Sequence, residues 1–291
     1  MSAPVCDLGV LAIFKNETLN LRLWLEHYLW QGVEHFYLVD NGSTDDPVGR
    51  VLGPYGYLDR GQVTYEYRPE PHAQPQHYAH MFRTHVKCRW LLVCDLDEFM
   101  FAAPGHAPSL AARVRQLDPH FDAVYVHWRM FASAEFNDRP SPSPAAGREG
   151  TPAGNGDPTV PETLLLDPRT GHPLDLRVAL TRCRPGLHAD HKYLFRTSIV
   201  RDPAQVWIHR LLDHAPADRV AFDDEGLRLH HYQTQSRFYF DTVKRVRGDA
   251  DGFLPDTARD WAYYAAANEG MVEEDATLAQ LVGGCDSGKA L

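Results

Sequence analysis

Apolar runs and amphipathic segments alternate along the first 130 residues. Short, almost entirely apolar runs are typical of strands buried on both faces of a parallel sheet, whereas apolar residues at every third or fourth position are typical of helices. Residues 8–14 form the first apolar run, and a helix with Asn16 as N-cap and Gly32 at its end is expected to follow. Further strands are predicted at residues 35–39, 62–67, 90–94 and 122–128, and a helix at residues 76–87. The alternation predicts an α/β fold with a Rossmann-like, mostly parallel central sheet flanked by helices.

The pattern changes after the strand at residues 122–128. Residues 138–161 contain six Pro and four Gly in 24 positions, which indicates an irregular insertion: either a plain surface loop, or a lid or acceptor-binding loop. Beyond it we expect strands at residues 199–200, 206–208 and 227–232, and helices at residues 236–247, 261–267 and 276–281. We interpret residues 1–248 as one domain, with halves at 1–100 and 101–248, and residues 249–291 as a C-terminal helical extension.

Composition and charge narrow the class of protein. The chain is 44% hydrophobic and 23% charged, as in ordinary globular proteins. Its 29 basic and 39 acidic residues give a formal net charge of −10, which disfavours nucleic-acid binding through a general basic surface. Five cysteines without a C-x-x-C pair suit a reducing compartment. Because neither a membrane-spanning apolar run nor a signal peptide is recognisable, we expect a cytoplasmic protein, with peripheral membrane association left open.

Several common motifs are missing. No G-x-G-x-x-G follows the first strand, which argues against a dinucleotide-binding fold. Residues 283–289 resemble a P-loop only superficially, because Ala290 replaces the expected Ser or Thr and no helix follows. There is no H-E-x-x-H, and the spacing of the histidines between residues 72 and 85 fits no standard zinc motif.

The strongest candidate for chemistry is the sequence Asp95-Leu96-Asp97, directly after an apolar strand. In an extended segment alternate side chains point the same way, so both carboxylates are expected at one spot, with Leu96 directed into the core. Carboxylate oxygens suit Mg²⁺ or Mn²⁺. A turn cluster without a ligand is the alternative. The position of this sequence favours a site, because the acidic turn at residues 40–46 ends the second strand of the same sheet and ligands collect at this edge of such sheets.

Together these motifs resemble nucleotide-sugar glycosyltransferases of the GT-A fold, most closely the family 2 and family 92 types. The resemblance extends over residues 8–248, and its motifs are specific to the fold but say little about which sugar is transferred. It rests on Lys15, Asn16, Glu17, residues 24–28, 32–36 and 40–45, Gln76, Trp90, residues 95–99, Lys192, residues 198–201, His209, His231, Tyr232, Ser236 and residues 244–248.

The resemblance implies roles for individual residues. A divalent cation, Mn²⁺ or Mg²⁺, would be held by Asp95, Asp97 and His231, although His231 is equally well interpreted as a hydrogen-bonded strand residue. The second acidic residue that is usual after the second strand is Asn41 in this chain. The implied donor-binding residues are Asn16, Glu17, Asp40, Asn41, Gln76, Asp95, Lys244 and Arg247.

The implied reaction is an inverting, metal-dependent transfer of a hexose, with galactose as the best candidate, from a UDP-sugar to a glycan acceptor. Inversion requires one carboxylate to accept the proton of the incoming hydroxyl. Asp190 and Glu162 are the first candidates for this base, with Glu135 and Asp213 behind them. A nucleotidyltransferase and a catalytically inactive glycan- or nucleotide-binding module are the alternatives.

Overall fold

The computed structural model describes residues 6–134, 175–213, 216–248, 250, 252, 255 and 258–286. The chain forms two compact units. The first comprises residues 1–129, 187–231 and 247–258, and the second comprises residues 130–186, 232–246 and 259–291. The proposed insertion at residues 138–161 and the candidate bases Glu135 and Glu162 lie outside the described residues.

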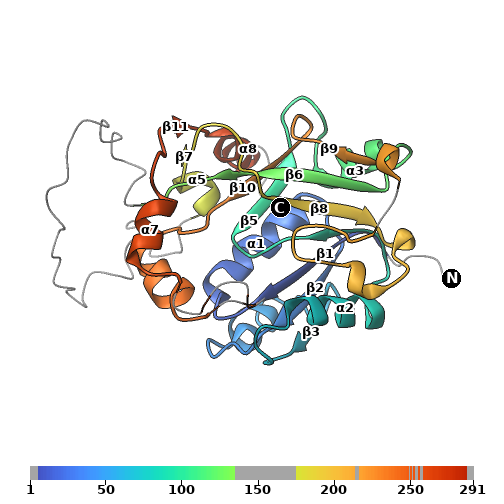
Figure 1. The fold of residues 1–291 in the computed structure, drawn as a ribbon, viewed down its shortest axis with the longest axis horizontal. Helices are drawn as coiled ribbons and strands as arrows, with labels where there is room; N and C mark the ends of the chain where they lie inside the picture. The colour runs from blue at the N-terminus through green and yellow to red at the C-terminus, as the bar shows by residue number, and fades with distance from the viewer. Residues whose placement is uncertain are drawn as a thin grey trace, which may run out of the picture. The chain divides into compact units, whose positions relative to one another are not determined.

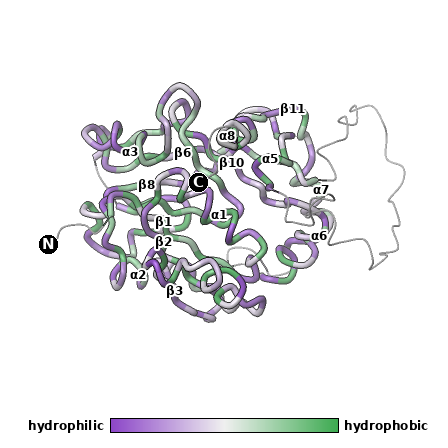
Figure 2. The backbone as a smooth tube through the Cα atoms, turned by 180° about the vertical axis from the view of Figure 1, so that it is seen from behind, coloured by the Kyte–Doolittle hydropathy of each residue, from purple (hydrophilic) through white to green (hydrophobic). Residues whose placement is uncertain are grey.

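Four parallel strands form the N-terminal part of the central sheet, in the order β3-β2-β1-β4 (Figure 1). Each lies within two residues of a predicted strand, so the hydrophobic pattern located this half correctly. Strand β1 appears hydrophobic along most of its length in Figure 2. Their bounds are β1 Cys6–Phe14, β2 His35–Asp40, β3 Val63–Tyr67 and β4 Cys88–Val93.

The sheet continues beyond β4 with mixed strand directions. Strand β8 lies between β4 and β6 and is antiparallel to both, β9 is parallel to β6, and β5 pairs antiparallel with β10. The predicted strands at 122–128 and 227–232 are confirmed as β6 and β10, and the α/β class is confirmed. The additional strands are β5 Glu98–Ala102, β6 Ala123–Met130, β8 His191–Arg196, β9 Val220–Phe222 and β10 Leu227–His231.

Two predicted strands are wrong. Residues 199–200 lie at the end of a 3₁₀ turn, η3 Thr197–Ile199, and Val206 forms only an isolated bridge with Leu211. Between them lies the 3₁₀ turn η4 Pro203–Gln205, which Asp202 and Gln205 close with a reciprocal capping box. This local capping, together with a proline that cannot donate to a ladder, outweighs the strand propensity of Ile and Val.

Helices α1, α2 and α3 belong to the first unit, and α2 lies beside β3 and β2 (Figures 1 and 2). Gly32 ends α1 as predicted, with φ +84°. Asn16 does not cap α1. It has φ +55° and precedes Glu17, the N-cap residue, while Asp45 Oδ2 accepts the Thr18 amide at 2.9 Å. The bounds are α1 Thr18–Trp30, η1 Val48–Leu52, α2 Gln74–Thr84, α3 Leu110–Leu117 and η5 Ala217–Arg219.

The second unit is mostly helical. Its predicted basic helix is present as α6 followed by a π-helical segment, η6, and α7 and α8 confirm the helices expected at 261–267 and 276–281. Ser133 is buried and its backbone amide donates to Asn268 Oδ1 at 2.7 Å. The elements are α5 Leu176–Ala179, β7 Arg182–Cys183, α6 Arg237–Tyr239, η6 Phe240–Lys244, α7 Trp261–Ala267, β11 Glu273–Glu274 and α8 Thr277–Asp286.

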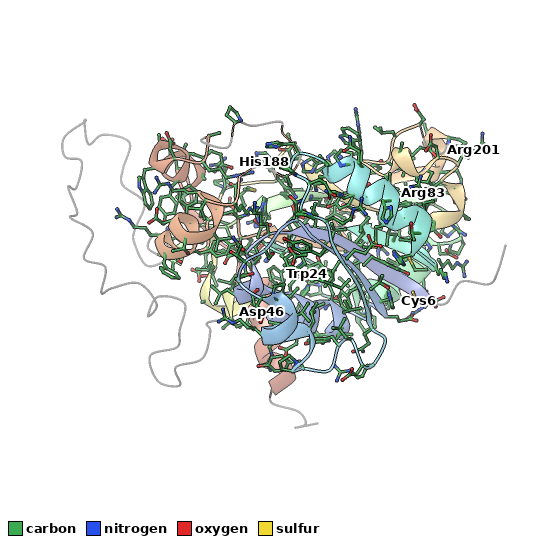
Figure 3. All side chains as sticks on the ribbon, turned by 90° about the horizontal axis from the view of Figure 1, so that it is seen from below. Cys6, Trp24, Asp46, Arg83, His188 and Arg201 are labelled. Atoms are coloured by element: carbon green, nitrogen blue, oxygen red, sulfur yellow. The ribbon has the colours of Figure 1, made fainter. Side chains whose placement is uncertain are left out.

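The core of the first unit lies between the sheet and its helices. Two aromatic residues of α1, Trp24 and Tyr28, are fully buried in this core. Trp24 is labelled in Figure 3. The four cysteines whose side chains are described, at positions 6, 88, 94 and 183, form no disulfide and are buried, as small apolar residues would be. In the described part of the chain no helix has the length and apolar character needed to cross a membrane.

Tyr28 attaches α1 to the segment that follows β4. Its hydroxyl donates to the Glu98 carbonyl at 3.1 Å and accepts the Met100 amide at 3.0 Å. Trp24 adds a bond from its indole N–H to the Asp95 carbonyl at 2.9 Å. The turn carrying Asp95 and Asp97 is therefore held from one side by a helix.

Replacing Tyr28 by Phe should remove both bonds and leave a buried carbonyl and a buried amide without this partner. We expect Tyr28→Phe to lower the free energy of unfolding by about 1–3 kcal/mol. Tyr55→Phe is the matched control, because the Tyr55 hydroxyl accepts from Arg22 at an exposed position and its loss should cost less than about 0.5 kcal/mol. Urea unfolding of both variants tests this, and equal losses would contradict it.

Candidate active site

The loops after β1 and β2 are joined to each other at the carboxyl edge of the sheet. Phe14 and Asp40 end the two strands in register. The Asn16 amide donates to Ser43 Oγ at 2.9 Å, and the Thr44 amide donates to Asn16 Oδ1 at 2.7 Å. The predicted donor-binding residues of the two loops are therefore brought together.

Asp40 and Asn41 are both buried and direct their side chains to neighbouring backbone and hydroxyl groups. Asp40 accepts from the Ser43 amide at 2.7 Å and from the Tyr65 hydroxyl at 2.6 Å. Asn41 Nδ2 donates to the carbonyls of Arg68 and Glu70 at 2.7 and 2.8 Å. A carboxylate could not make these two donations, which gives a physical reason for Asn at this position.

The remaining predicted donor-binding residues are distributed differently. Arg247 forms an ion pair with Glu17, whose side chain is only 2% exposed, across 230 positions of sequence. Gln76 is exposed on α2, whereas its neighbours Gln74 and His77 are buried. Lys244 is buried at the end of η6 in the second unit. The structure thus brings Arg247 to the loop after β1 and leaves Gln76 at the surface.

A tight turn, instead of an extended segment, connects β4 to β5. The Glu98 amide donates to the Asp95 carbonyl at 3.1 Å, and Glu98 Oε2 accepts the Asp95 amide at 2.8 Å. Leu96 is fully buried, as predicted. The expectation that Asp95 and Asp97 alternate along an extended strand is wrong, because these two bonds close the chain on itself.

Lys192, at the second position of β8, is completely buried beside the two acids of this turn. Its Nζ lies 2.8 Å from Asp95 Oδ2 and 3.6 Å from Glu98 Oε2. Burial would lower the pKa of Lys192, but the two carboxylates outweigh it and raise that pKa well above its usual value. Burial raises the pKa of Glu98 to about 7, against the opposing effect of Lys192.

Asp97 lies on the other side of the turn, against His231 at the end of β10. His231 Nε2 is 3.4 Å from Asp97 Oδ2, and their side chains are 7% and 3% exposed. His231 Nδ1 has no hydrogen-bond partner among the described residues. Neighbouring ligand atoms around Mn²⁺ or Mg²⁺ are about 3 Å apart, so this pair has a spacing at which both side chains could bind one cation. The Asp95 carboxylate instead contacts Lys192.

Three histidines surround the Trp128 ring near this pair. The Trp128 ring centroid lies 4.5 Å from that of His231, 5.3 Å from that of His209 and 5.6 Å from that of His188. Burial, reinforced by the positive charge of Lys192, lowers the pKa of His209 to about 4, so His209 is neutral near pH 7. The hydrophobic pattern identified Trp128 only as a strand residue, because neighbours from distant strands are invisible in sequence.

Asp190 is the candidate base that the structure places at this edge. It immediately precedes β8, whose antiparallel register with β4 brings its start beside the end of β4. The Asp190 carbonyl accepts the Trp128 amide at 3.0 Å, and its carboxylate is 57% exposed and 3.4 Å from His188 Nδ1. Asp213 is exposed, with φ +46°, and its carbonyl accepts from Gln205 at 2.8 Å.

These features define an α/β protein with buried acids, a buried lysine and a histidine at the carboxyl edge of its parallel strands. The sequence model of the protein family called glycosyltransferase family 92 matches residues 10–263 of this chain. The chain therefore belongs to glycosyltransferase family 92.

Relatives in two plants carry the same family name. A glycosyltransferase family 92 protein of Ricinus communis is 33% identical over 101 residues, which are 34% of this chain and 17% of the relative. One of Oryza sativa subsp. japonica is 30% identical over 95 residues, 32% of this chain and 16% of the relative. The matched segments span about a sixth of the length of these relatives.

A solved structure similar to this chain is the mannosyltransferase PcManGT from Pyrobaculum calidifontis in complex with GDP-Man and Mn²⁺. The sequence identity is 17% and the TM-score 0.37. The match covers 100% of this chain and 77% of PcManGT.

Removing the Lys192 charge should destabilise the protein, because Asp95 and Glu98 would lose their buried counter-ion. We expect Lys192→Met to lower the free energy of unfolding by about 3 kcal/mol. Lys87→Met, at an exposed lysine just before β4, should change it by less than about 0.5 kcal/mol. Urea unfolding at neutral pH compares the two, and similar values would show that the buried charges do not stabilise the fold.

Proposed function

We propose that this protein is a metal-dependent, inverting glycosyltransferase that moves a hexose from a UDP-sugar to a glycan acceptor. The observation that carries the proposal is the contact of Asp97 with His231 at the carboxyl edge of the sheet, in a chain that belongs to a glycosyltransferase family. The same edge holds the Asp40 and Asn41 turn. A nucleotide and a cation would thus be bound by loops at the same edge of the sheet.

Asp97 and His231 are the residues we propose to hold Mn²⁺ or Mg²⁺. The 3.4 Å separation of His231 Nε2 from Asp97 Oδ2 fits a shared cation. A bound divalent cation would supply positive charge against the departing diphosphate. Asp95 would serve the donor side, with its orientation set by Lys192. The ion pair of Arg247 with Glu17 keeps a second positive group at the loop after β1.

Asp190 is our candidate for the general base. Its carboxylate is exposed, so an acceptor hydroxyl can reach it, while its backbone is fixed to Trp128. It would accept the proton of the attacking hydroxyl as the new glycosidic bond forms and the sugar–phosphate bond breaks. UDP-galactose is the first donor to test, followed by other UDP-hexoses, and polysaccharide biosynthesis is the process in which such a transfer would act.

Release of UDP from UDP-sugars in the presence of Mn²⁺ tests the proposal directly. Asp97→Ala should remove Mn²⁺-dependent UDP binding and reduce UDP release at least about a hundredfold, because the cation loses a charged ligand. Asp59→Ala is the control, since Asp59 is exposed and remote in sequence from the site.

Calorimetry with UDP and a coupled UDP-release assay provide the two readouts. Unchanged affinity in Asp97→Ala would place the cation elsewhere. Donor binding without release for any acceptor or for water would instead indicate a binding module.

A separate variant tests the base. Asp190→Asn should keep UDP-sugar affinity within about twofold and lower the transfer rate by about 10²–10⁴-fold, the usual contribution of general base catalysis. Comparison with Asp202→Asn, an exposed acid that only caps η4, controls for general effects. Full transfer activity in Asp190→Asn would exclude it as the base.

A further inference from the structure

A second cluster of ligating side chains lies between β3 and α2. In the described part of the chain, Glu66, His80 and His85 are the only three such side chains whose ligand atoms all lie within 4.8 Å of one another. His85 Nε2 is 2.5 Å from Glu66 Oε1, and His80 Nε2 is 3.1 Å from Glu66 Oε2. All three side chains are partly accessible, at 22–32% exposure.

The end of α2 makes this cluster possible. In an uninterrupted helix two residues five positions apart point about 140° away from each other. Helix α2 ends at Thr84, and His85 follows with φ −124° and ψ −31°. The His85 amide still donates to the Met81 carbonyl at 2.9 Å, but with these non-helical dihedrals the His85 side chain reaches the same carboxylate as His80. Arg83, labelled on α2 in Figure 3, lies between these two histidines in the sequence and is exposed.

We propose that Glu66, His80 and His85 form a binding site for a borderline divalent transition metal ion, of which Zn²⁺ is the best match. Two imidazole nitrogens and one carboxylate oxygen are a ligand set that Zn²⁺ takes, leaving a fourth position for water. Imidazole favours Zn²⁺, Ni²⁺ or Co²⁺ over Mg²⁺. The site is distinct from Asp97 and His231 and does not depend on the proposed transferase activity.

The positively charged Arg68 side chain already lies near the cluster. Arg68 Nη1 is 3.5 Å from Glu66 Oε2, a long contact, while Arg68 Nε donates to His77 Nδ1 at 2.9 Å. The Arg68 side chain is 28% exposed, so it can move toward solvent when a metal ion occupies the site. The contact between the Glu66 carboxylate and Arg68 is thus weak, and an incoming metal ion can replace it.

Metal binding here would fasten the edge strand to its neighbouring helix. Glu66 belongs to β3, in register with Val39 of β2, and both histidines come from the end of α2. The loop between β3 and α2 carries the two carbonyls that Asn41 holds. A metal ion would therefore stiffen the segment that supports the turn after β2.

The test is a Zn²⁺ titration of untagged, chelator-treated full chain by calorimetry, with Co²⁺ absorption as a check on ligand geometry. We expect one Zn²⁺ per chain that raises the thermal midpoint of unfolding, and a His80→Gln/His85→Gln variant that binds it about tenfold or more weakly. His120→Gln, at an exposed histidine outside the cluster, should bind as the unaltered chain does.

Two further variants separate the possible outcomes. Asp97→Ala should bind Zn²⁺ as the unaltered chain does, whereas Glu66→Gln should bind it more weakly. Urea unfolding checks that each variant is folded. Failure of the unaltered chain to bind Zn²⁺, or equal affinity in the His80→Gln/His85→Gln variant, would overturn the proposal and leave the cluster as an ion-pair network. Loss of Zn²⁺ only in Asp97→Ala would assign it to the edge site instead.

Discussion

The buried ammonium group of Lys192 is the constraint on which the edge of the sheet depends. It is completely enclosed, and it neutralises Asp95 while remaining close to Glu98. Without a cation, two acids in this position would repel each other in a poorly hydrated environment. The lysine is delivered by β8, so the insertion of that strand between β4 and β6 is also what makes the acidic turn stable.

The acidic turn is held from several directions. Helix α1 contributes Trp24 and Tyr28, which bind backbone atoms of the turn and of β5. Strand β10 contributes His231 against Asp97. These side chains come from two different elements of the first unit, α1 and β10. Preorganisation of this kind suits a site that must hold charged ligands, because the polar groups are already oriented before a ligand arrives.

The sequence predicted the parallel half of the sheet well, because three of its four strands, β1, β2 and β4, are almost entirely buried and carry runs of apolar residues. It missed β5 and β8, and the reason is physical. Strand β8 carries Lys192 and Arg196, charged residues that pair with Asp95 and Asp118, 97 and 78 positions away. It also placed Asn16 as a helix cap, whereas Asp45 from the next loop supplies that bond.

The candidate site could be predicted from the sequence only in part. Its acids were identified because they follow apolar strands, and His231 entered through a family resemblance. The sequence did not show that the two aspartates have different partners. Asp95 contacts Lys192, while Asp97 contacts His231. The cluster at Glu66, His80 and His85 was dismissed on spacing, because the spacing of histidines alone omits a carboxylate from another strand and the end of α2.

The place of β8 in the sheet has a consequence for synthesis of the chain. Strands β1 to β4 are complete once residue 93 has been made, but the free edge of β4 finds its partner only when residues 191–196 emerge. During that interval the nascent chain exposes an apolar strand edge, with unpaired amides and carbonyls, to other chains. Synthesis of this chain therefore includes an interval of nearly one hundred residues in which one edge of β4 has no partner strand.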